Sequence, residues 1–293
     1  MAPQRLEPTR TDGCPSRCLT MHGPWARWKA WRETRTLAMR PIPDALWEQT
    51  LARYPFLAWR AESDLLRLRE LSTLFLADKE FSGVGELQVT DEMAVHIAAQ
   101  ACLPIIAFSL NCYDGCKGIV IHLGAVSARR ETVDEHGVVH QYLEELSGEA
   151  MQGGPVMLSW RDVAEGGQSA KWGYNVVVHE FVHVLHQHRG WSQYDSNGDN
   201  PGAWAESLQD QYRQFCVSVN DGVDALMDRY AAENIEEFLA VAAETFFVMP
   251  NELRYRLPRL YQLLAEYFEQ DPASTTPTPN TTRTVRKCSR PWQ

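Results

Sequence analysis

Apolar residues in the first third of the chain recur at the spacing of amphipathic helices. Between residues 62 and 79, leucine and phenylalanine return every three or four positions, which places them on one face of a helix. Pro43 opens a shorter segment of the same kind, and Thr90 stands where an N-cap residue belongs. The pattern predicts helices over residues 43–53, 62–79 and 90–104.

The pattern changes in the middle of the chain, where short β-branched runs are bounded by glycine. These runs predict strands over residues 118–123, 138–143 and 155–160. Helical periodicity then returns, and it predicts helices over residues 174–185, 203–219, 223–231, 235–248 and 256–270. We therefore expect a mainly helical α+β fold with one small, mostly antiparallel sheet beside the helix that contains residues 174–185.

Composition and charge narrow the classes of protein to which the chain can belong. It has 293 residues, of which 44% are hydrophobic, so it is long and apolar enough to bury a core. A net charge of −10 is opposite to that of a general nucleic-acid binder, so we expect no direct contact with nucleic acid. No apolar run approaches the roughly 20 residues that cross a bilayer, so we expect no transmembrane segment.

The N-terminus and the cysteines favour a cytoplasmic protein. Residues 1–40 contain no apolar segment typical of a secretory signal. The number of cysteines is odd, at seven, and unpaired thiols in a reducing compartment account for them best. The pairs Cys14/Cys18 and Cys112/Cys116 leave a four-thiolate zinc site as the alternative, although their spacing departs from the usual C-x-x-C pattern.

The two ends of the chain differ in composition from its centre. Residues 1–40 are rich in Lys and Arg, with tryptophans at positions 25, 28 and 31, and we expect a basic, flexible N-terminal extension there. Residues 273–293 are rich in Thr and Pro and cannot bury a core, so we expect a disordered tail. Between them, residues 41–272 are predicted to form the globular domain.

The segment with the clearest chemistry is His179-Glu180-Phe181-Val182-His183, an H-E-x-x-H sequence inside an apolar helical run. Residues four positions apart share a helix face, so His179 and His183 can bind one metal ion together. Glu180 then lies close enough to act as a base toward a water molecule. Burying these polar side chains among Val, Phe and Leu is costly unless something pairs with them, and a metal ion does so.

A catalytic zinc ion needs a third protein ligand, and the spacing leaves two candidates open. Glu206 lies 23 residues beyond His183, whereas Glu237 lies on a later helix that also carries Glu244 on the same face. A histidine ten residues after His179, as metzincins require, is absent because that position is arginine. Spacing places Glu237 only slightly ahead of Glu206.

Several further segments resemble the Mlc titration factor A family of bacterial zinc peptidases, and the resemblance covers roughly residues 41–272. The matching segments are FLADKEF at 75–81, IAAQACL at 97–103, GPVMLSW at 154–160, GYNVVVHEF at 173–181, YAAE at 230–233, EFLAV at 237–241 and YFEQDP at 267–272. The resemblance implies a zincin-like metallopeptidase of the gluzincin type that binds one Zn²⁺ through His179, His183 and Glu237. It also implies that Tyr230 assists by donating a hydrogen bond to the oxyanion.

The same resemblance implies a function and a partner. We expect a zinc-dependent, aminopeptidase-like hydrolase of short peptides or proteins, in which Glu180 is the base. We also expect strand 156–160 to hold the substrate as an added strand. The alternative is a regulatory protein that sequesters a glucose-responsive transcriptional repressor, with peptidase activity secondary.

Two positions depart from the family pattern: Val182 stands where the family has Ala, and the second departure bears on the metal site. The family continues its motif with Asp where this chain has His186. His186 either replaces that Asp in orienting a ligand or contacts the metal itself, which in a closed site of four ligands would make the zinc purely structural.

Overall fold

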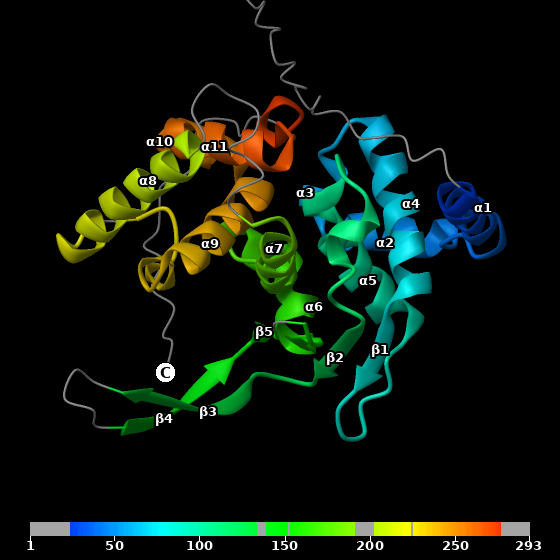
Figure 1. Ribbon diagram of the computed structural model, residues 1–293, viewed down its shortest axis with the longest axis horizontal. Helices are drawn as coiled ribbons and strands as arrows, with labels where there is room; N and C mark the ends of the chain where they lie inside the picture. The colour runs from blue at the N-terminus through cyan, green and yellow to red at the C-terminus, as the bar shows by residue number, and fades with distance from the viewer. Residues whose placement is uncertain (1–23, 134–138, 152, 191–201, 224, 277–293) are drawn as a thin grey trace, which may run out of the picture.

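A computed structural model of the protein describes residues 24–133, 139–151, 153–190, 202–223 and 225–276, and it confirms the mainly helical α+β fold. In Figure 1, helix α7 lies at the centre, between an N-terminal group of helices on one side and a C-terminal group on the other. The α-helices are α1 (Pro24–Met39), α2 (Asp44–Arg53), α3 (Pro55–Ala58), α4 (Glu62–Asp78), α5 (Asp91–Cys102), α6 (Trp160–Ser169), α7 (Val176–Arg189), α8 (Ala203–Asn220), α9 (Ile235–Val248), α10 (Pro250–Arg256) and α11 (Pro258–Phe268). Short 3₁₀ turns are η1 (Leu103–Ile105), η2 (Leu110–Tyr113), η3 (Ala170–Trp172), η5 (Arg229–Ala232) and η6 (Pro272–Ser274).

Helix α5 is the central element of the N-terminal group. It begins where the sequence predicts, because the Thr90 hydroxyl accepts a hydrogen bond from the backbone N–H of Met93 at 3.2 Å. It packs against α2, α4 and α7, so side chains on nearly all its faces are buried. Since burial of one large apolar side chain contributes about 1.5–3 kcal/mol, this packing anchors the N-terminal helices to α7.

The sheet is mixed, which corrects one part of our expectation. Its strands are β1 (Glu80–Gly83), β2 (Gly118–His122), β5 (Gly148–Ala150) and β6 (Val156–Ser159), in the order β1-β2-β6-β5. The pairs β1–β2 and β2–β6 are parallel, and only β5–β6 is antiparallel. The expectation of a mostly antiparallel sheet is therefore wrong, because α5 lies in the connection between β1 and β2 and returns the chain in the same direction.

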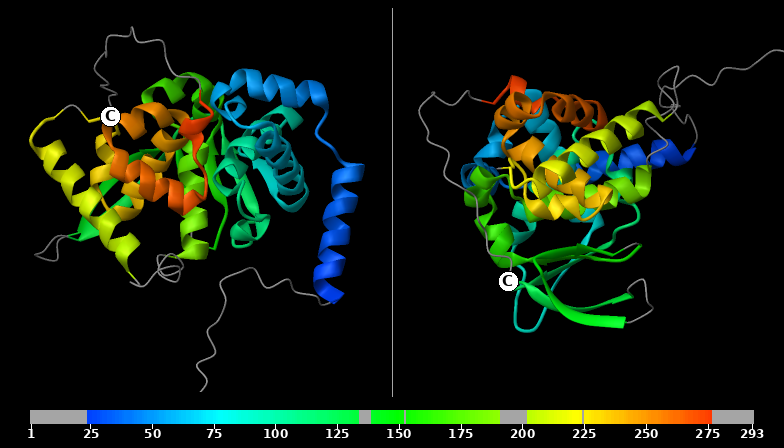
Figure 2. Two further views of the ribbon diagram at one scale, coloured as in Figure 1. Left: turned by 90° about the horizontal axis from the view of Figure 1, so that it is seen from above. Right: turned by 90° about the vertical axis from the view of Figure 1, so that its left-hand side faces the viewer.

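A separate antiparallel hairpin follows β2. It consists of β3 (Val126–Val133) and β4 (Val139–Leu146), and it extends away from the helices in Figures 1 and 2. The predicted strand at 138–143 lies largely within β4. This hairpin, with β5, lies in the long connection between the two parallel neighbours β2 and β6.

Two predicted C-terminal helices differ from the observed ones. The expected helix at 223–231 is wrong: α8 is followed by Gly222 with φ +69°, and Asp228 caps only the short turn η5. The expected helix at 256–270 corresponds to the slightly shorter α11, which Pro258 starts at its N-terminus, whereas α10 precedes it and was not predicted. Helix α6, which the sequence did not reveal, begins at the Ser159 cap.

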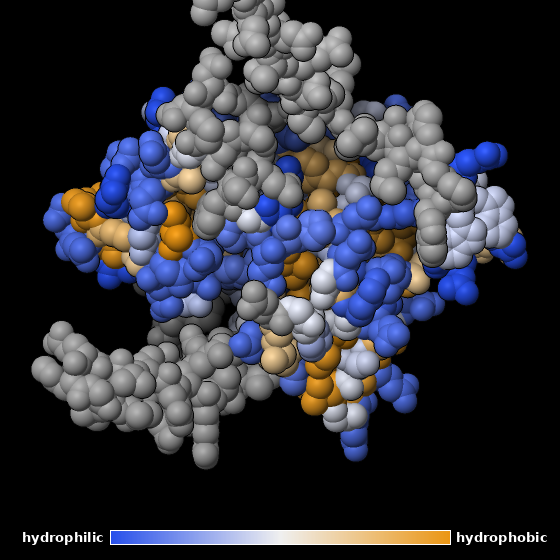
Figure 3. All heavy atoms as spheres, in the orientation of Figure 1, coloured by the Kyte–Doolittle hydropathy of each residue, from blue (hydrophilic) through white to orange (hydrophobic). Residues whose placement is uncertain are grey.

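Hydrophilic side chains cover much of the described face in Figure 3, and apolar groups appear there as separate patches. None of the described helices is both long and apolar enough to cross a membrane.

Part of the expected N-terminal extension forms helix α1, whereas residues 1–23 and most of the expected tail lie outside the described residues. The division of the chain at residues 41 and 272 stays a prediction.

Candidate metal centre

Helix α7 carries the H-E-x-x-H sequence, and its start is fixed by Asn175. The Asn175 side-chain oxygen accepts a hydrogen bond from the backbone N–H of Val178 at 2.9 Å, which caps the helix. The preceding Gly173 has φ +76°, a conformation that glycine adopts without strain. The first turn of α7 is therefore rigidly placed, and His179 follows one turn later.

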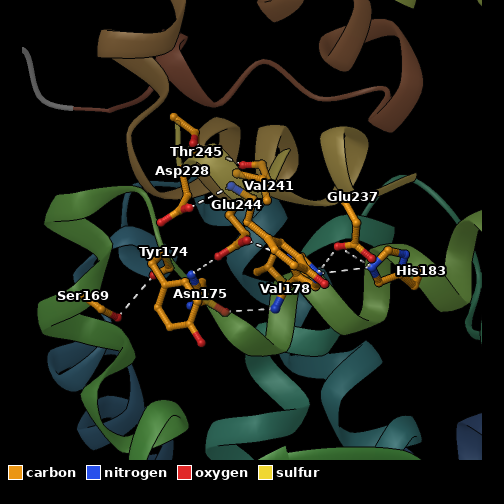
Figure 4. Close-up of polar contacts among 12 residues, drawn as sticks. Ser169, Tyr174, Asn175, Val178, His183, Asp228, Glu237, Val241, Glu244 and Thr245 are labelled. Carbon is orange, nitrogen blue, oxygen red and sulfur yellow. Dashed lines mark hydrogen bonds and ion pairs between the residues drawn. The ribbon is translucent and has the colours of Figure 1, made fainter. Parts of the chain in front are cut away.

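The structure brings His179, His183 and Glu237 together. Among the described residues, one ligand atom from each of these three side chains lies within 4.8 Å of the others. The Glu237 Oε2 atom is 3.0 Å from His179 Nε2 and 3.5 Å from His183 Nε2, and the two Nε2 atoms are 3.2 Å apart. Figure 4 shows Glu237 reaching from α9 toward His183 on α7.

These separations fit one tetrahedral zinc ion. Zinc binds histidine nitrogen and carboxylate oxygen at about 2.0–2.2 Å, so two ligands at a tetrahedral angle lie about 3.3–3.5 Å apart. The observed separations of 3.0, 3.2 and 3.5 Å lie at or slightly below this range. The side chains of His179, His183 and Glu237 are 12%, 18% and 17% exposed, so the group is mostly buried but still reached by solvent.

Glu244 lies behind His179 and fixes the orientation of its ring. The His179 Nδ1–H donates to Glu244 Oε1 at 2.8 Å, and Glu244 is 2% exposed. With a metal ion bound, a neutral His179 that keeps its proton on Nδ1 would direct its Nε2 lone pair toward the ion, which the Glu237 carboxylate also faces. A carboxylate behind a ligand histidine is a regular feature of zinc sites.

The electrostatics of the group favour a bound positive charge. Burial alone would lower the pKa of His179, but its hydrogen bonds to Glu237 and Glu244 outweigh this and hold the pKa well above its ordinary value. Burial likewise opposes ionisation of Glu237, but its contacts with His179 and His183 prevail and lower its pKa to about 2. Glu237 is therefore an anion at neutral pH, as a metal ligand must be.

Glu180 points from the same helix toward the edge strand β5. It is 5% exposed, and burial raises its pKa above the ordinary value. A Cβ atom added at Gly148 on β5 would lie only 2.5 Å from Glu180 Oε1 and 2.7 Å from its Cγ. Only glycine leaves room for this carboxylate, so β5 and Glu180 are in direct contact.

Tyr230 stands beside the group on turn η5. Its backbone N–H donates to Asp228 Oδ1 at 2.9 Å, which starts the turn. Its ring centroid lies 6.2 Å from that of His179. The tyrosine is thus close to the predicted ligands, and its role in catalysis stays a prediction.

The alternative ligands do not join the group. Glu206 is exposed on α8, and neither it nor His186 belongs to the converging group found among the described residues. Burial, with the nearby charge of His183, lowers the pKa of His186 to about 4, which leaves it neutral at pH 7. The four described cysteines are free thiols, and Cys14 and Cys18 lie outside the described residues.

The sequence comparisons identify the family to which this geometry belongs. The model of the glucose-regulated metallo-peptidase M90 family matches residues 28–269. The chain belongs to this family.

Individual relatives of the chain match over most of their length. An uncharacterized protein of Synechocystis sp. is 30% identical over 257 residues, which cover 85% of this chain and 91% of the relative. Proteins named Mlc titration factor A are 28% identical in Cronobacter sakazakii, over 83% of this chain and 91% of the relative, and 30% identical in Serratia proteamaculans, over 78% and 88%. The resemblance inferred from the sequence is thereby confirmed.

The sequence did not predict the contacts that three residues make at the site. Asn175 precedes an apolar run, which is the ordinary signal of an N-cap, but nothing in the sequence shows that it also meets Glu244. Gly148 and Gln100 carry no local signal, because their contacts with Glu180 and Asn175 join segments far apart in the chain.

Proposed function

We propose that this M90 family member is a zinc-dependent peptidase whose metal is held by His179, His183 and Glu237. The convergence of the three ligand atoms at tetrahedral spacing is the observation that carries the proposal. A bound zinc ion supplies Lewis acidity, which lowers the pKa of a water molecule to about 7 and polarises a peptide carbonyl.

The remaining chemistry falls to side chains of the chain itself. Glu180 accepts a proton from the attacking water and delivers it to the leaving amine, for which its raised pKa suits it. Tyr230 donates a hydrogen bond to the oxyanion that develops on the carbonyl. The low exposure of Glu180 keeps bulk water from competing for its proton.

The substrate binds along β5 in this proposal. Strand β6, which the sequence suggested for this purpose, is paired on both sides and has no free edge, whereas β5 is the last strand of the sheet. The Ser147 carbonyl accepts from Ser159 of β6, and the Met151 N–H donates to Pro155 just before β6. The N–H and C=O groups of Gly148 and Ala150 therefore face the open edge. An extended peptide paired there would lie beside Glu180. Aminopeptidase-like cleavage of short peptides is the specificity we propose.

Replacing Glu180 by Gln tests this mechanism. The variant keeps the volume and the three ligands but cannot accept a proton, so kcat on a fluorogenic peptide should fall by at least about 10²-fold with zinc content unchanged. Glu206→Gln is the matched control, since Glu206 is an exposed acid outside the group. Peptide cleavage by the Glu180→Gln variant at the wild-type rate would contradict the proposed role of Glu180 as the base.

A second candidate function is binding of a transcriptional repressor. The names of the relatives point to Mlc, and the net charge of −10 suits contact with a basic DNA-binding protein. Purified Mlc repressor, offered to wild-type protein and to Glu180→Gln, distinguishes the functions. Equal capture by both would make binding independent of catalysis, and no capture by either would remove this candidate.

A further inference from the structure

Asn175 uses every polar group that it has, and three of its four contacts lead toward the metal centre. Its side-chain oxygen caps α7 through Val178, and its carbonyl oxygen accepts from the His179 N–H at 3.0 Å. Its backbone N–H donates to Glu244 Oε2, the second oxygen of the carboxylate that orients His179. Figure 4 shows Asn175 between Val178 and Glu244. One residue therefore holds both the backbone of His179 and the partner of its ring.

The fourth contact of Asn175 leads away from the centre, to Gln100 on α5. The Asn175 side-chain NH₂ donates to Gln100 Oε1 at 2.7 Å, and both side chains are buried, at 1% and 0% exposure. The Gln100 amide cannot turn over, because its own NH₂ donates to the carbonyl oxygen of His96 at 2.9 Å. Gln100 thus presents a fixed acceptor to Asn175 across 75 residues of sequence.

A third helix, α6, also packs against the hydrogen bond between Asn175 and Gln100. Gly166 on α6 approaches so closely that an added Cβ would lie 3.2 Å from Gln100 Oε1, 3.3 Å from the Tyr54 ring and 3.6 Å from Asn175 Nδ2. The pair is enclosed by α5, α6 and α7, where a polar group without a partner is costly. Among the described residues, Gln100 is the acceptor that Asn175 Nδ2 uses in this enclosed position.

We propose that Gln100 is a positioning residue for the metal centre, acting through Asn175 and Glu244 on His179. The proposal rests on the metal site proposed above. Gln100 does not touch the metal or the substrate. By fixing the Asn175 amide, it holds the backbone N–H that anchors Glu244, and Glu244 in turn keeps the proton of His179 on Nδ1. The His179 ring is then held with Nε2 directed at the metal position.

Substitution of Gln100 by Leu removes the acceptor while keeping an apolar side chain of similar length. We expect the dissociation constant for Zn²⁺, measured by competition with a chelator, to rise about tenfold. In metal-free protein we expect the NMR signal of the His179 Nδ1–H proton to broaden or disappear. Gln100→Glu should restore both readouts to within about threefold of wild type, because a buried neutral acid supplies an acceptor to Asn175 and a donor to His96.

Tyr113→Phe is the matched control for stability. It also removes one buried hydrogen bond near α5, from the Tyr113 hydroxyl to the carbonyl oxygen of Ala101 at 2.7 Å, and it keeps the ring contact with Phe181 on α7. We expect it to lower the melting temperature about as much as Gln100→Leu without changing zinc affinity. Equal zinc affinities in Gln100→Leu and Tyr113→Phe, with the His179 signal unchanged, would overturn the proposal.

The outcome is separable from that of the proposed function. Neither readout measures peptide cleavage. A protein that binds zinc but cleaves no peptide therefore still tests the positioning role of Gln100. If wild-type protein binds no zinc, the proposed metal site fails, and the His179 Nδ1–H signal alone decides whether Gln100 orients the ring.

Discussion

Replacing Gly148 by Ala should disable Glu180 while leaving the metal ligands in place. The new Cβ atom would lie 2.5 Å from Glu180 Oε1, whereas ordinary contact begins at 3.4 Å. The carboxylate must therefore retreat by about 0.9 Å, the difference between these distances. A displacement of about 1 Å in a catalytic group costs roughly 10²-fold in rate, or about 2.7 kcal/mol of activation free energy. The variant itself should lose about 1–3 kcal/mol of stability from overpacking.

The assay is kcat on a fluorogenic peptide, together with zinc content and melting temperature. Gly115→Ala is the matched control, because an added Cβ there meets nothing within 4 Å and the backbone lies outside the left-handed region. We expect Gly115→Ala to keep wild-type kcat. If Gly148→Ala bound zinc and kept kcat within twofold of wild type, the contact between β5 and Glu180 would have no role in catalysis.

Three further predictions follow from the site and from the core. Tyr230→Phe should lower kcat about tenfold or more with KM nearly unchanged, because the lost hydrogen bond forms only as the oxyanion develops; an unchanged kcat would leave Tyr230 as a packing residue. Glu237→Gln should weaken zinc binding at least about tenfold, measured by chelator competition, whereas Glu206→Gln should not, and the reverse result would exchange the two ligands. His96 is fully buried, neither ring nitrogen has a hydrogen-bond partner among the described residues, and burial lowers its pKa to about 4. Its contribution to stability is thus lost as pH falls from about 6.5 toward 4, so urea unfolding should show about 2 kcal/mol less stability from this group at pH 5 than at pH 7.5, and His96→Leu should remove that part of the slope.

The sequence predicted those parts of the site that local spacing determines. The i, i+4 histidines and Glu180 follow from one helix, and the apolar pattern placed that helix correctly. Spacing left Glu206 as an alternative to Glu237, because 58 residues separate Glu237 from His179 and only the packing of α7 against α9 brings these two side chains together. The same limit explains why Gly148 and Gln100 were missed, since their roles depend on contacts between distant segments.

The errors in the fold have a related origin. Alternation within a strand shows that it pairs, but the direction of pairing depends on what connects it to its neighbour. The sequence did not predict β1, and the connection from β1 to β2 contains α5, so the parallel pairing of these two strands could not be foreseen. The helix at 223–231 did not form because Gly222 ends the preceding helix just before it, and Asp228, a residue that caps helices, lies within it.

The position of Glu237 on α9 gives the metal site a second consequence. A metal ion shared by His179 and Glu237 closes a loop of 58 residues, and that loop contains α8 and the turn η5. Such a link acts on the unfolded chain as a cross-link does, because it removes conformations that the open loop would sample. Chelation should therefore increase amide hydrogen exchange throughout α8 and the first turn of α9, well beyond the residues that touch the ion. The metal ion proposed to act in catalysis would in this way also hold the C-terminal helices to the centre of the molecule.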